Sequence, residues 1–440
     1  MTNQTQKSSR YHATVILQEI TIQGAYANIA LRKALPESGL DSRDRAFVTD
    51  LVNTTLRNLI AIDHIINHFS NTSTSKMKPF ILSLLRISVC QIRYIEKTPE
   101  SAAVNEAVNL AKQNGYKGLS GFVNGVLRNI VRQPEAPEIH GIAMEYSYPK
   151  WLAADLVKWL GNENAKSFCH QSHQPPPVTI FANTHKITVP DLANRLLSEG
   201  IEATPLGDEF LIISRTGDIT QLPAFNEGLF FVMDPGAVWT VKALRLTPGQ
   251  TVFDLCAAPG GKSFTAACYM GNQGQVKAFD LHPHRANLIR ETARRLNLNC
   301  ITTHIKDSLV HDKTLKAQAD AVLLDAPCTG YGTIRKRPEI KYNRNPQDAK
   351  DLAVKQRQML SIASKYVKPG GTLVYSTCTV AREENIDNVR WFLQNHSFKM
   401  RPIDLPNPEA IPYILEDDCL QILPSTYNDG FFIASFTCEP

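Results

Sequence analysis

After Thr247 the chain alternates short β-rich runs with longer helical runs, and this alternation constrains its fold more than any other feature. Each β-rich run leads into a loop and then into apolar residues at helical spacing. Strands that alternate with helices form a doubly wound, mostly parallel α/β sheet. Ligands bind such sheets beyond the carboxyl ends of the strands, so the residues after each run are the first candidates for a site. The runs cover residues 251–255, 275–279, 321–324 and 372–375.

The remaining sequence predicts two further domains. A length of 440 residues suggests about three domains rather than one core. Residues 1–135 place apolar side chains at helical spacing, which predicts an all-α bundle. In residues 140–245, strand-like runs that begin at Val178 and Phe210 enclose one helical run, which predicts a small α/β connector. Residues 246–440 then form the larger α/β domain.

Composition excludes several classes of protein. No apolar run approaches the roughly 18 to 20 residues that cross a bilayer. Residues 1–10 are polar and lack the apolar stretch of a secretory signal. The nine cysteines are odd in number and scattered, without a C-x-x-C pair or zinc-ligand spacing. We therefore expect a cytoplasmic protein with reduced thiols, no metal and no membrane contact.

Positive charge is concentrated in the first third of the chain. Residues 1–135 carry 16 Lys and Arg against 10 Asp and Glu, whereas the remainder carries 31 against 32. Such an excess favours a polyanionic partner, although solvated helix faces also produce it.

A glycine-containing loop follows the first β-rich run. Gly260 and Gly261 permit a tight turn and a close approach to a ligand, and the following helix points its positive end at that ligand. A phosphate-binding P-loop requires G-x-x-x-x-G-K-S/T, but Cys256 occupies the first glycine position; a dinucleotide loop requires G-x-G-x-x-G, which is also missing. We therefore expect a cofactor without a phosphate group. The candidate cofactor-binding residues of the loop are Cys256, Ala257, Ala258, Pro259, Gly260, Gly261 and Lys262.

Acidic residues follow the next runs at positions suited to a nucleoside. Asp280 comes about twenty residues after the glycines, where a carboxylate grips ribose hydroxyls. Asp307 would face the adenine, and Asp325 adds a carboxylate after the run at 321–324. Several carboxylates suit a cofactor that carries a positive sulfonium, which indicates S-adenosyl-L-methionine. The alternative is that these residues only cap helices.

Two cysteines stand directly after central β-rich runs. Cys328 lies in Asp325-Ala-Pro-Cys-Thr-Gly330, and Cys378 lies in Ser376-Thr-Cys-Thr379. A single cysteine is usually a small buried hydrophobe, but two at this edge, one beside an acid, indicate catalysis.

Methylation of a carbon that is not nucleophilic needs such a pair. Carbon 5 of cytosine does not attack a methyl donor unaided, but a thiolate that adds to carbon 6 turns the ring into an enamine. An acid at the N3 and N4 edge must stabilise the developing charge, and Asp325 is placed to do so. A helix predicted to begin near Ala381 would favour a thiolate at Cys378. Periodicity alone leaves open which cysteine attacks.

These motifs resemble those of a known family over essentially the whole chain. The chain is similar to the bacterial 16S rRNA cytosine-5 methyltransferases of the Fmu/Sun (RsmB) type, in the wider NOL1/NOP2/Sun family. The matching motifs, in chain order, are Cys256-Ala-Ala-Pro-Gly-Gly-Lys262, Asp325-Ala-Pro-Cys328-Thr-Gly330 with Arg335-Lys336-Arg337-Pro338, Thr377-Cys378, and Asp429-Gly-Phe-Phe-Ile-Ala434. Two places depart from the family pattern: Met233-Asp-Pro-Gly236 replaces Gln-Asp-Pro-Ala, and the stretch before Asp429 lacks a glycine.

The resemblance implies a role for each motif. It implies that Cys378 attacks carbon 6, that Cys328 assists release of the RNA, and that Asp325 binds the cytosine. It implies a NusB-like helical RNA-binding domain, an RNA-recognition-like connector, and a Rossmann-like methyltransferase domain with a mostly parallel seven-stranded sheet. The family target is cytosine 967 of 16S rRNA.

RNA contacts are expected just after the active-site loop, where basic residues would hold phosphates beside an extruded base. The rival interpretation is a solvated face. The expected substrate is 16S rRNA that is naked or early in assembly, and the expected state is a monomer. The candidate RNA-binding residues are Arg335, Lys336, Arg337 and Lys341, with Arg344 nearby.

Three other functions fit less well. Amino-group methyltransferases show D/N-P-P-Y/F after the strand that corresponds to the run at 321–324, and Asp325-Ala-Pro-Cys328 does not match that motif. A P-loop ATPase is disfavoured by Cys256. An RNA-binding assembly factor with a decayed catalytic domain is disfavoured by the intact Asp325, Cys328 and Cys378, and an activity assay separates it from an enzyme.

Overall fold

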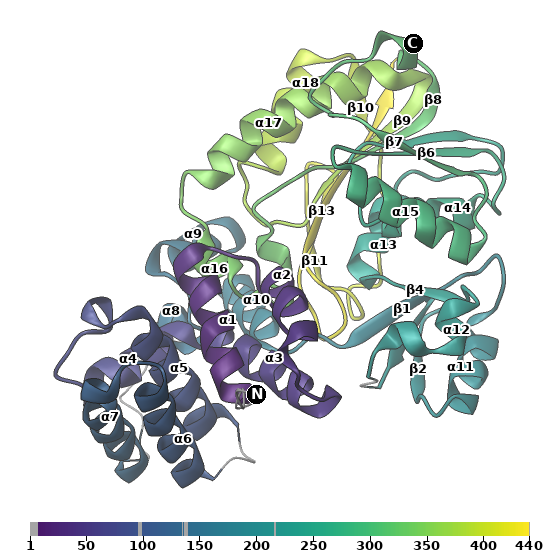
Figure 1. Ribbon diagram of the computed structural model, residues 1–440. Helices are drawn as coiled ribbons and strands as arrows, with labels where there is room; N and C mark the ends of the chain where they lie inside the picture. Colours follow the sequence, from purple (N-terminus) through teal and green to yellow (C-terminus); the bar gives the residue numbers. More distant parts are fainter. Residues whose placement is uncertain (1–7, 96–98, 134, 136–139, 215–216, 440) are drawn as a thin grey trace. The chain divides into compact units, whose positions relative to one another are not determined.

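The computed structural model describes residues 8–95, 99–133, 135, 140–214 and 217–439 (Figure 1). The chain divides into two compact units. Unit 1 runs as far as His173 and also contains Ile334–Asn345, whereas unit 2 contains Gln174–Thr333 and the chain from Pro346 onward. In the part of the chain that is described, no helix is long and apolar enough to cross a membrane.

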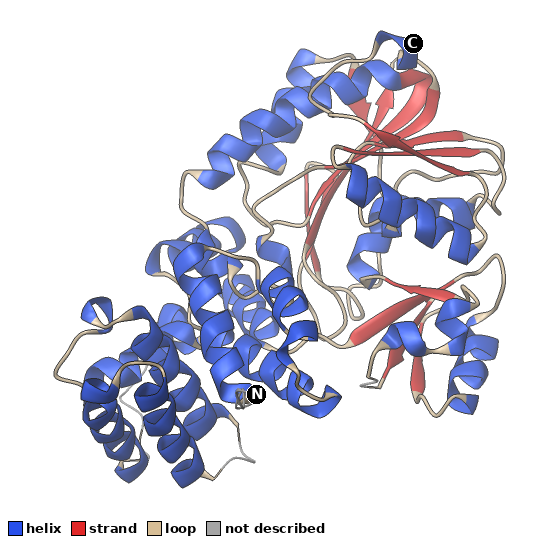
Figure 2. Cartoon of the chain, in the orientation of Figure 1, coloured by secondary structure: helices blue, strands red, loops and turns tan. Residues whose placement is uncertain are grey.

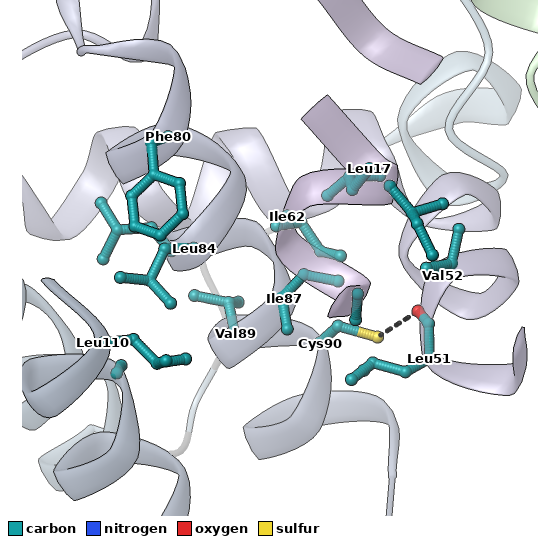
Figure 3. Packing of buried hydrophobic residues seen from close by; sticks show 14 of the residues in the cluster. Leu17, Leu51, Val52, Ile62, Phe80, Leu84, Ile87, Val89, Cys90 and Leu110 are labelled. Carbon is teal, nitrogen blue, oxygen red and sulfur yellow. Dashed lines mark hydrogen bonds between the residues drawn. The ribbon is translucent and has the colours of Figure 1, made fainter. Parts of the chain in front are cut away.

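Unit 1 is all-helical, as the apolar periodicity predicted. Its α-helices are α1 Ser9–Gln23, α2 Ala27–Ala34, α3 Ser42–Arg57, α4 Leu59–Phe69, α5 Pro79–Tyr94, α6 Glu100–Gln113, α7 Ser120–Arg132, α8 Gly141–Glu145, α9 Lys150–Leu160, α10 Asn162–His173 and α16 Ile340–Asn343. The Asp41 carboxylate caps α3 by accepting from the Asp44 amide at 2.8 Å. Leu17, Val52 and Ile87 contribute to one buried core (Figure 3).

The segment Ile334–Asn345 belongs to unit 1, although the chain on either side of it belongs to unit 2. Lys341 is 2% exposed, and its ammonium donates to the backbone oxygens of Arg57 at 2.9 Å and Tyr146 at 3.0 Å. It also lies 4.8 Å from the centre of the Tyr148 ring. Lys341 therefore holds the segment to unit 1.

This division differs from the domain boundaries that the sequence predicted. We expected the helical domain to end near residue 135 and the connector to cover residues 140–245. Helices α8, α9 and α10 instead group with unit 1, and the first strand of the connector begins at Val178.

Unit 2 begins with a four-stranded antiparallel sheet in the order β2-β3-β1-β4. Its elements are β1 Val178–Ala182, α11 Val189–Ser198, β2 Ala203–Leu206, β3 Phe210–Ile213, α12 Pro223–Asn226 and β4 Phe230–Val232. The runs predicted at Val178 and Phe210 are β1 and β3. Asn183 follows β1 and donates to the backbone oxygens of Gly228 at 2.9 Å and Leu296 at 2.8 Å, which ties this sheet to the larger domain of unit 2.

The larger domain of unit 2 is built on a nine-stranded sheet in the order β11-β12-β13-β9-β8-β5-β6-β7, with β10 paired to β13. Strands β5 to β9 pair in parallel, and β10 to β13 pair antiparallel. The doubly wound fold is confirmed, but the sheet exceeds the seven strands expected because β10 and β11 extend its antiparallel end. The elements are α13 Pro235–Lys242, β5 Thr251–Asp254, α14 Gly261–Tyr269, β6 Gln275–Asp280, α15 Pro283–Leu296, β7 Ile301–Ile305, β8 Ala319–Asp325, α17 Asp348–Ala363, β9 Val367–Thr377, α18 Ile386–Asn395, β10 Phe398–Met400, β11 Tyr413–Glu416, β12 Cys419–Ile422 and β13 Phe431–Cys438.

Helices cover both faces of this sheet (Figure 2). Successive side chains of a strand point to opposite faces, so Val252 packs in the cluster with α13, α14 and α15, and Phe253 packs in the cluster with α17 and α18. Because both faces are buried, the parallel strands are rich in apolar residues. Polar functional side chains are therefore expected beyond the carboxyl ends of these strands.

Candidate active site

The predicted site residues follow the carboxyl ends of neighbouring parallel strands. Asp254 at the end of β5 pairs in register with Leu323 of β8. Asp325 at the end of β8 pairs in register with Ser376 of β9, and Cys378 follows β9 directly. The register therefore brings the glycine loop and both cysteine motifs to one edge of the sheet.

The glycine loop turns sharply between β5 and α14. Gly260 has a φ of 111°, in a region that side chains strongly disfavour, and an added Cβ would lie 2.3 Å from Cζ of Phe264. The Ala257 amide donates to the Phe279 backbone oxygen at 2.8 Å, which joins the loop to the end of β6. Helix α14 begins at Gly261, so its positive end faces the loop.

Carboxylates surround this loop. Asp280, 4% exposed, accepts from the His282 amide at 3.0 Å, and Asp307, half-buried, accepts from the Leu309 amide at 2.9 Å. Each therefore closes a local turn, and neither is the N-cap residue of a helix. Burial raises the pKa of Asp254 to about 7, although the Ser263 hydroxyl donates to it at 2.6 Å and opposes the rise.

The Lys262 ammonium forms an ion pair with the Asp325 carboxylate at 2.6 Å. It is therefore not available for a phosphate group, as the lysine of a P-loop would be. Burial is the largest single effect and disfavours the ammonium, but the charge and hydrogen bond of Asp325, together with the charges of Cys378 and Asp254, raise the pKa of Lys262 above its ordinary value. The Ser376 hydroxyl donates to the other Asp325 oxygen at 2.8 Å. Asp325 is thus held from both sides, and the loop differs from a P-loop in chemistry as well as in sequence.

The Sγ atoms of Cys328 and Cys378 lie 3.2 Å apart, both as half-buried free thiols. The neighbouring Cys378 sulfur and burial together hold the pKa of Cys328 well above its ordinary value. The expectation that two thiols meet at this edge is therefore met by the geometry. In contrast, Cys90, Cys169, Cys268 and Cys419 are buried in cores, as most single cysteines are.

A buried polar cluster joins the two cysteine loops, and we call Thr329, Thr379 and Glu384 the clamp. The Thr329 and Thr379 hydroxyls lie 2.7 Å apart. The Glu384 carboxylate, fully buried, accepts from the Thr329 hydroxyl at 2.5 Å and the Thr329 amide at 3.0 Å. It also accepts from the Gln356 side chain at 2.8 Å. The hydrogen bond between the two threonines joins the residue after Cys328 to the residue after Cys378, and Glu384 fixes Thr329 in place.

Sequence reasoning missed the clamp, and one related expectation is wrong. We expected a helix near Ala381 whose dipole acts on Cys378. Helix α18 begins only at Ile386, and the dipole effect fades within the first turn. The intervening turn instead carries Glu384. A lone acid before a helix is too common in sequences to have indicated its role.

The expected RNA contacts divide into two kinds. Arg335 and Lys341 are each 2% exposed and lie inside unit 1, so phosphate contact by these two side chains is ruled out in this structure. The Lys341 ammonium donates hydrogen bonds to the backbone oxygens of Arg57 and Tyr146 instead. Lys336 and Arg337 are exposed.

The two departures from the family pattern lie against each other. The Asp234 carboxylate accepts from the Gly236 amide at 2.9 Å and the Asp429 amide at 3.0 Å. A Cβ at Gly236 would lie 2.9 Å from the Asp429 backbone oxygen. Glycine at position 236 therefore suits the backbone path at Asp429.

Family comparisons cover all three parts of the chain. The model described as NusB family matches residues 7–132, and a ferredoxin-like domain of the RsmF/B-like methyltransferases matches residues 148–220. The model described as 16S rRNA methyltransferase RsmB/F matches residues 241–437.

Individual relatives match over nearly the full length. The probable ribosomal RNA small subunit methyltransferase B of Bacillus subtilis (strain 168) is 38% identical over 93% of this chain and 94% of its own. Ribosomal RNA small subunit methyltransferase B of Shewanella oneidensis is 31% identical over 92% of this chain and 94% of its own. The crystal structure of PH0851 has a TM-score of 0.81 at 25% identity, covering 98% of this chain and 99% of that one. With its helical, ferredoxin-like and catalytic parts each matched in order, the chain belongs to the RsmB/F family of S-adenosyl-L-methionine-dependent 16S rRNA methyltransferases.

Proposed function

We propose that this chain methylates carbon 5 of one cytosine in 16S rRNA, cytosine 967 in the family numbering, through a transient bond between Cys378 and carbon 6. The observation that carries the proposal is the pair of sulfur atoms 3.2 Å apart beside Asp325 at the carboxyl edge of the sheet. A methyltransferase that acts on carbon 5 of cytosine needs a thiol that adds to carbon 6 of the ring and a second group that helps this thiol leave.

The Cys378 thiolate forms the new bond to carbon 6. The electron pair of the C5=C6 bond forms a C4=C5 bond, and the pair of the C4=N3 bond moves onto N3, where Asp325 stabilises the developing charge at the N3 and N4 edge. The Lys262 ammonium, 2.6 Å from Asp325, adds positive charge to that edge. Carbon 5 becomes the nucleophile that accepts the methyl group.

The cofactor-binding residues we assign are Cys256 to Lys262 in the loop, with Asp280, Asp307 and Asp325. Their chemistry fits S-adenosyl-L-methionine, because they offer carboxylates and backbone groups while the loop lysine is paired with Asp325. When bound, the cofactor supplies a methyl group on a positively charged sulfur.

Release reverses the addition. Water takes the proton from carbon 5, the freed electron pair re-forms the C5=C6 bond, and the bond from carbon 6 to Cys378 breaks. We assign Cys328 to this step, because its thiol lies 3.2 Å from the leaving sulfur and can donate a hydrogen bond to the departing thiolate. The raised pKa of Cys328 keeps its proton available for that role.

The substrate we propose is naked or early-assembly rRNA, because the target base must leave its stack to reach two half-buried thiols. Lys336 and Arg337 remain the proposed phosphate contacts after Arg335 and Lys341 are excluded. The protein would act as a monomer.

The function is tested by incubating the purified chain with labelled S-adenosyl-L-methionine and naked 16S rRNA and then mapping 5-methylcytosine. We expect label at one cytosine, at the family position. Methylation of an exocyclic amine, of adenine or of protein would contradict the proposal, as would binding of RNA without any methyl transfer.

Glu384→Gln should lower kcat by about 10- to 100-fold while leaving the affinity for cofactor unchanged, because small displacements of reacting groups carry costs of this order. The new amide group would face the Thr329 and Gln356 donors, so we also expect a loss of about 1–3 kcal/mol in unfolding free energy. Glu384 acts here as a positioning residue. Single-turnover methylation and thermal unfolding measure the two effects.

Glu383→Gln is the matched control. Glu383 is the half-buried neighbour of Glu384, and this substitution makes the same charge change outside the clamp. It should retain near-normal kcat. Equal kcat values for Glu384→Gln and the unmodified chain would contradict the role of Glu384 as a positioning residue.

A further inference from the structure

Unit 1 contains a pocket whose charged lining is entirely positive. The pocket has a volume of about 420 Å³. Arg32 of α2, Arg45 of α3 and Lys336 of the segment Ile334–Asn345 line it, together with polar side chains that include Asn28 and Thr49. None of its described lining residues is acidic.

The two arginines have no acidic partner to offset their charge. Arg32 and Arg45 are exposed, and neither forms an ion pair with a described residue. With the described residues, the Arg45 side chain makes one long hydrogen bond, from Nε to the Asp41 backbone oxygen at 3.4 Å. Two arginines without acidic partners favour an anionic ligand, and the planar guanidinium donates two hydrogen bonds to a pair of phosphate oxygens.

The third cation comes from a distant part of the chain that is firmly fixed in unit 1. The Glu339 carboxylate accepts from the Ala27 amide, at the start of α2, at 3.1 Å. The Tyr342 hydroxyl donates to the Leu56 backbone oxygen, near the end of α3, at 2.9 Å. The segment that carries Lys336 is thus bonded to both helices that carry the arginines.

We propose that Arg32, Arg45 and Lys336 form a binding pocket for the phosphate backbone of the rRNA substrate. This proposal rests on the proposed function for its ligand, and it goes further by naming the site and its three cations. Lys336 follows Cys328 by eight residues, so the polypeptide itself tethers the pocket to the reactive loop.

The test is the salt dependence of binding to naked 16S rRNA, measured by filter binding without cofactor. The double variant Arg32→Gln with Arg45→Gln should reduce the slope of log K against log salt by about 1.4 to 1.8 and weaken binding about 10- to 30-fold at 0.15 M salt. Adding Lys336→Gln should reduce the slope by about a further 0.7 to 0.9.

The matched control is Lys33→Gln with Arg43→Gln. Both residues are exposed and lie on the same two helices, but they do not line the pocket. Their substitution removes the same amount of positive charge. The control should bind nearly as the unmodified chain does. If the pocket variant and the control variant weaken binding equally, or if the pocket variant leaves the slope unchanged, the proposed role of the pocket in RNA binding is refuted. Circular dichroism checks that each variant folds.

Methylation assays separate this result from the proposed function. A chain that methylates 16S rRNA but binds RNA independently of the pocket would refute the pocket alone. A chain that needs the pocket for RNA but never methylates would support the pocket and refute the proposed reaction.

Discussion

Cys378→Ala should abolish methyl transfer while leaving S-adenosyl-L-methionine binding intact. Without the thiolate, carbon 5 stays part of an electron-poor ring and cannot accept the methyl group, so we expect a loss of about 10³-fold or more. The Cys378 sulfur lies after β9 and does not belong to the glycine loop, so the affinity for cofactor should not change. Methyl transfer to 16S rRNA and calorimetric cofactor binding measure the two quantities.

Cys438→Ala provides the control, because it removes a half-buried thiol at the end of β13, away from the cysteine pair. It should methylate at a near-normal rate. Near-normal methylation by Cys378→Ala would show that the attacking group has been assigned wrongly.

Cys328→Ala should accumulate protein that is covalently joined to RNA. Attack by Cys378 does not need the second thiol, but the departing thiolate would lose the hydrogen-bond donor 3.2 Å away. The adduct should appear as a slow band on denaturing gels in the presence of cofactor, and turnover should fall by about 10²-fold or more.

The double variant Cys328→Ala with Cys378→Ala tests where this band comes from. It should give no slow band, because the attacking sulfur is missing. Rapid turnover without an adduct in Cys328→Ala alone would exclude a role for this thiol in release.

Much of this site followed from the sequence because strand ends are local features. The run at Val178 matches β1 from its first residue, and the runs that end near Asp254 and Asp325 match β5 and β8. Parallel register then brings Asp325 level with Ser376, two residues before Cys378. Apolar runs with polar residues directly after them were therefore sufficient to predict the cysteine pair.

The errors concern residues whose role depends on distant partners. Lys341 and Arg335 belong to a basic stretch that resembles an RNA contact. Lys341 is buried because backbone oxygens of Arg57 and Tyr146, far away in the sequence, accept its hydrogen bonds. Glu384 likewise depends on Thr329, 55 residues away. No local pattern encodes either contact.

The sheet shows a different kind of limit. Strands β10 and β11 are short segments at the antiparallel end of the sheet, Phe398–Met400 and Tyr413–Glu416. Periodicity did not predict these two strands, because they are short and neither leads into a helix as the parallel strands do. The expectation of seven strands came from the family resemblance, and nine are present.

The central claim is that sulfur of Cys378 bonds to the target base during each turnover. Digesting the Cys328→Ala protein–RNA complex with nuclease and protease, followed by mass spectrometry, locates that bond. We predict a methylated cytidine attached to the peptide that contains Cys378. A nucleotide attached to any other residue would contradict the account.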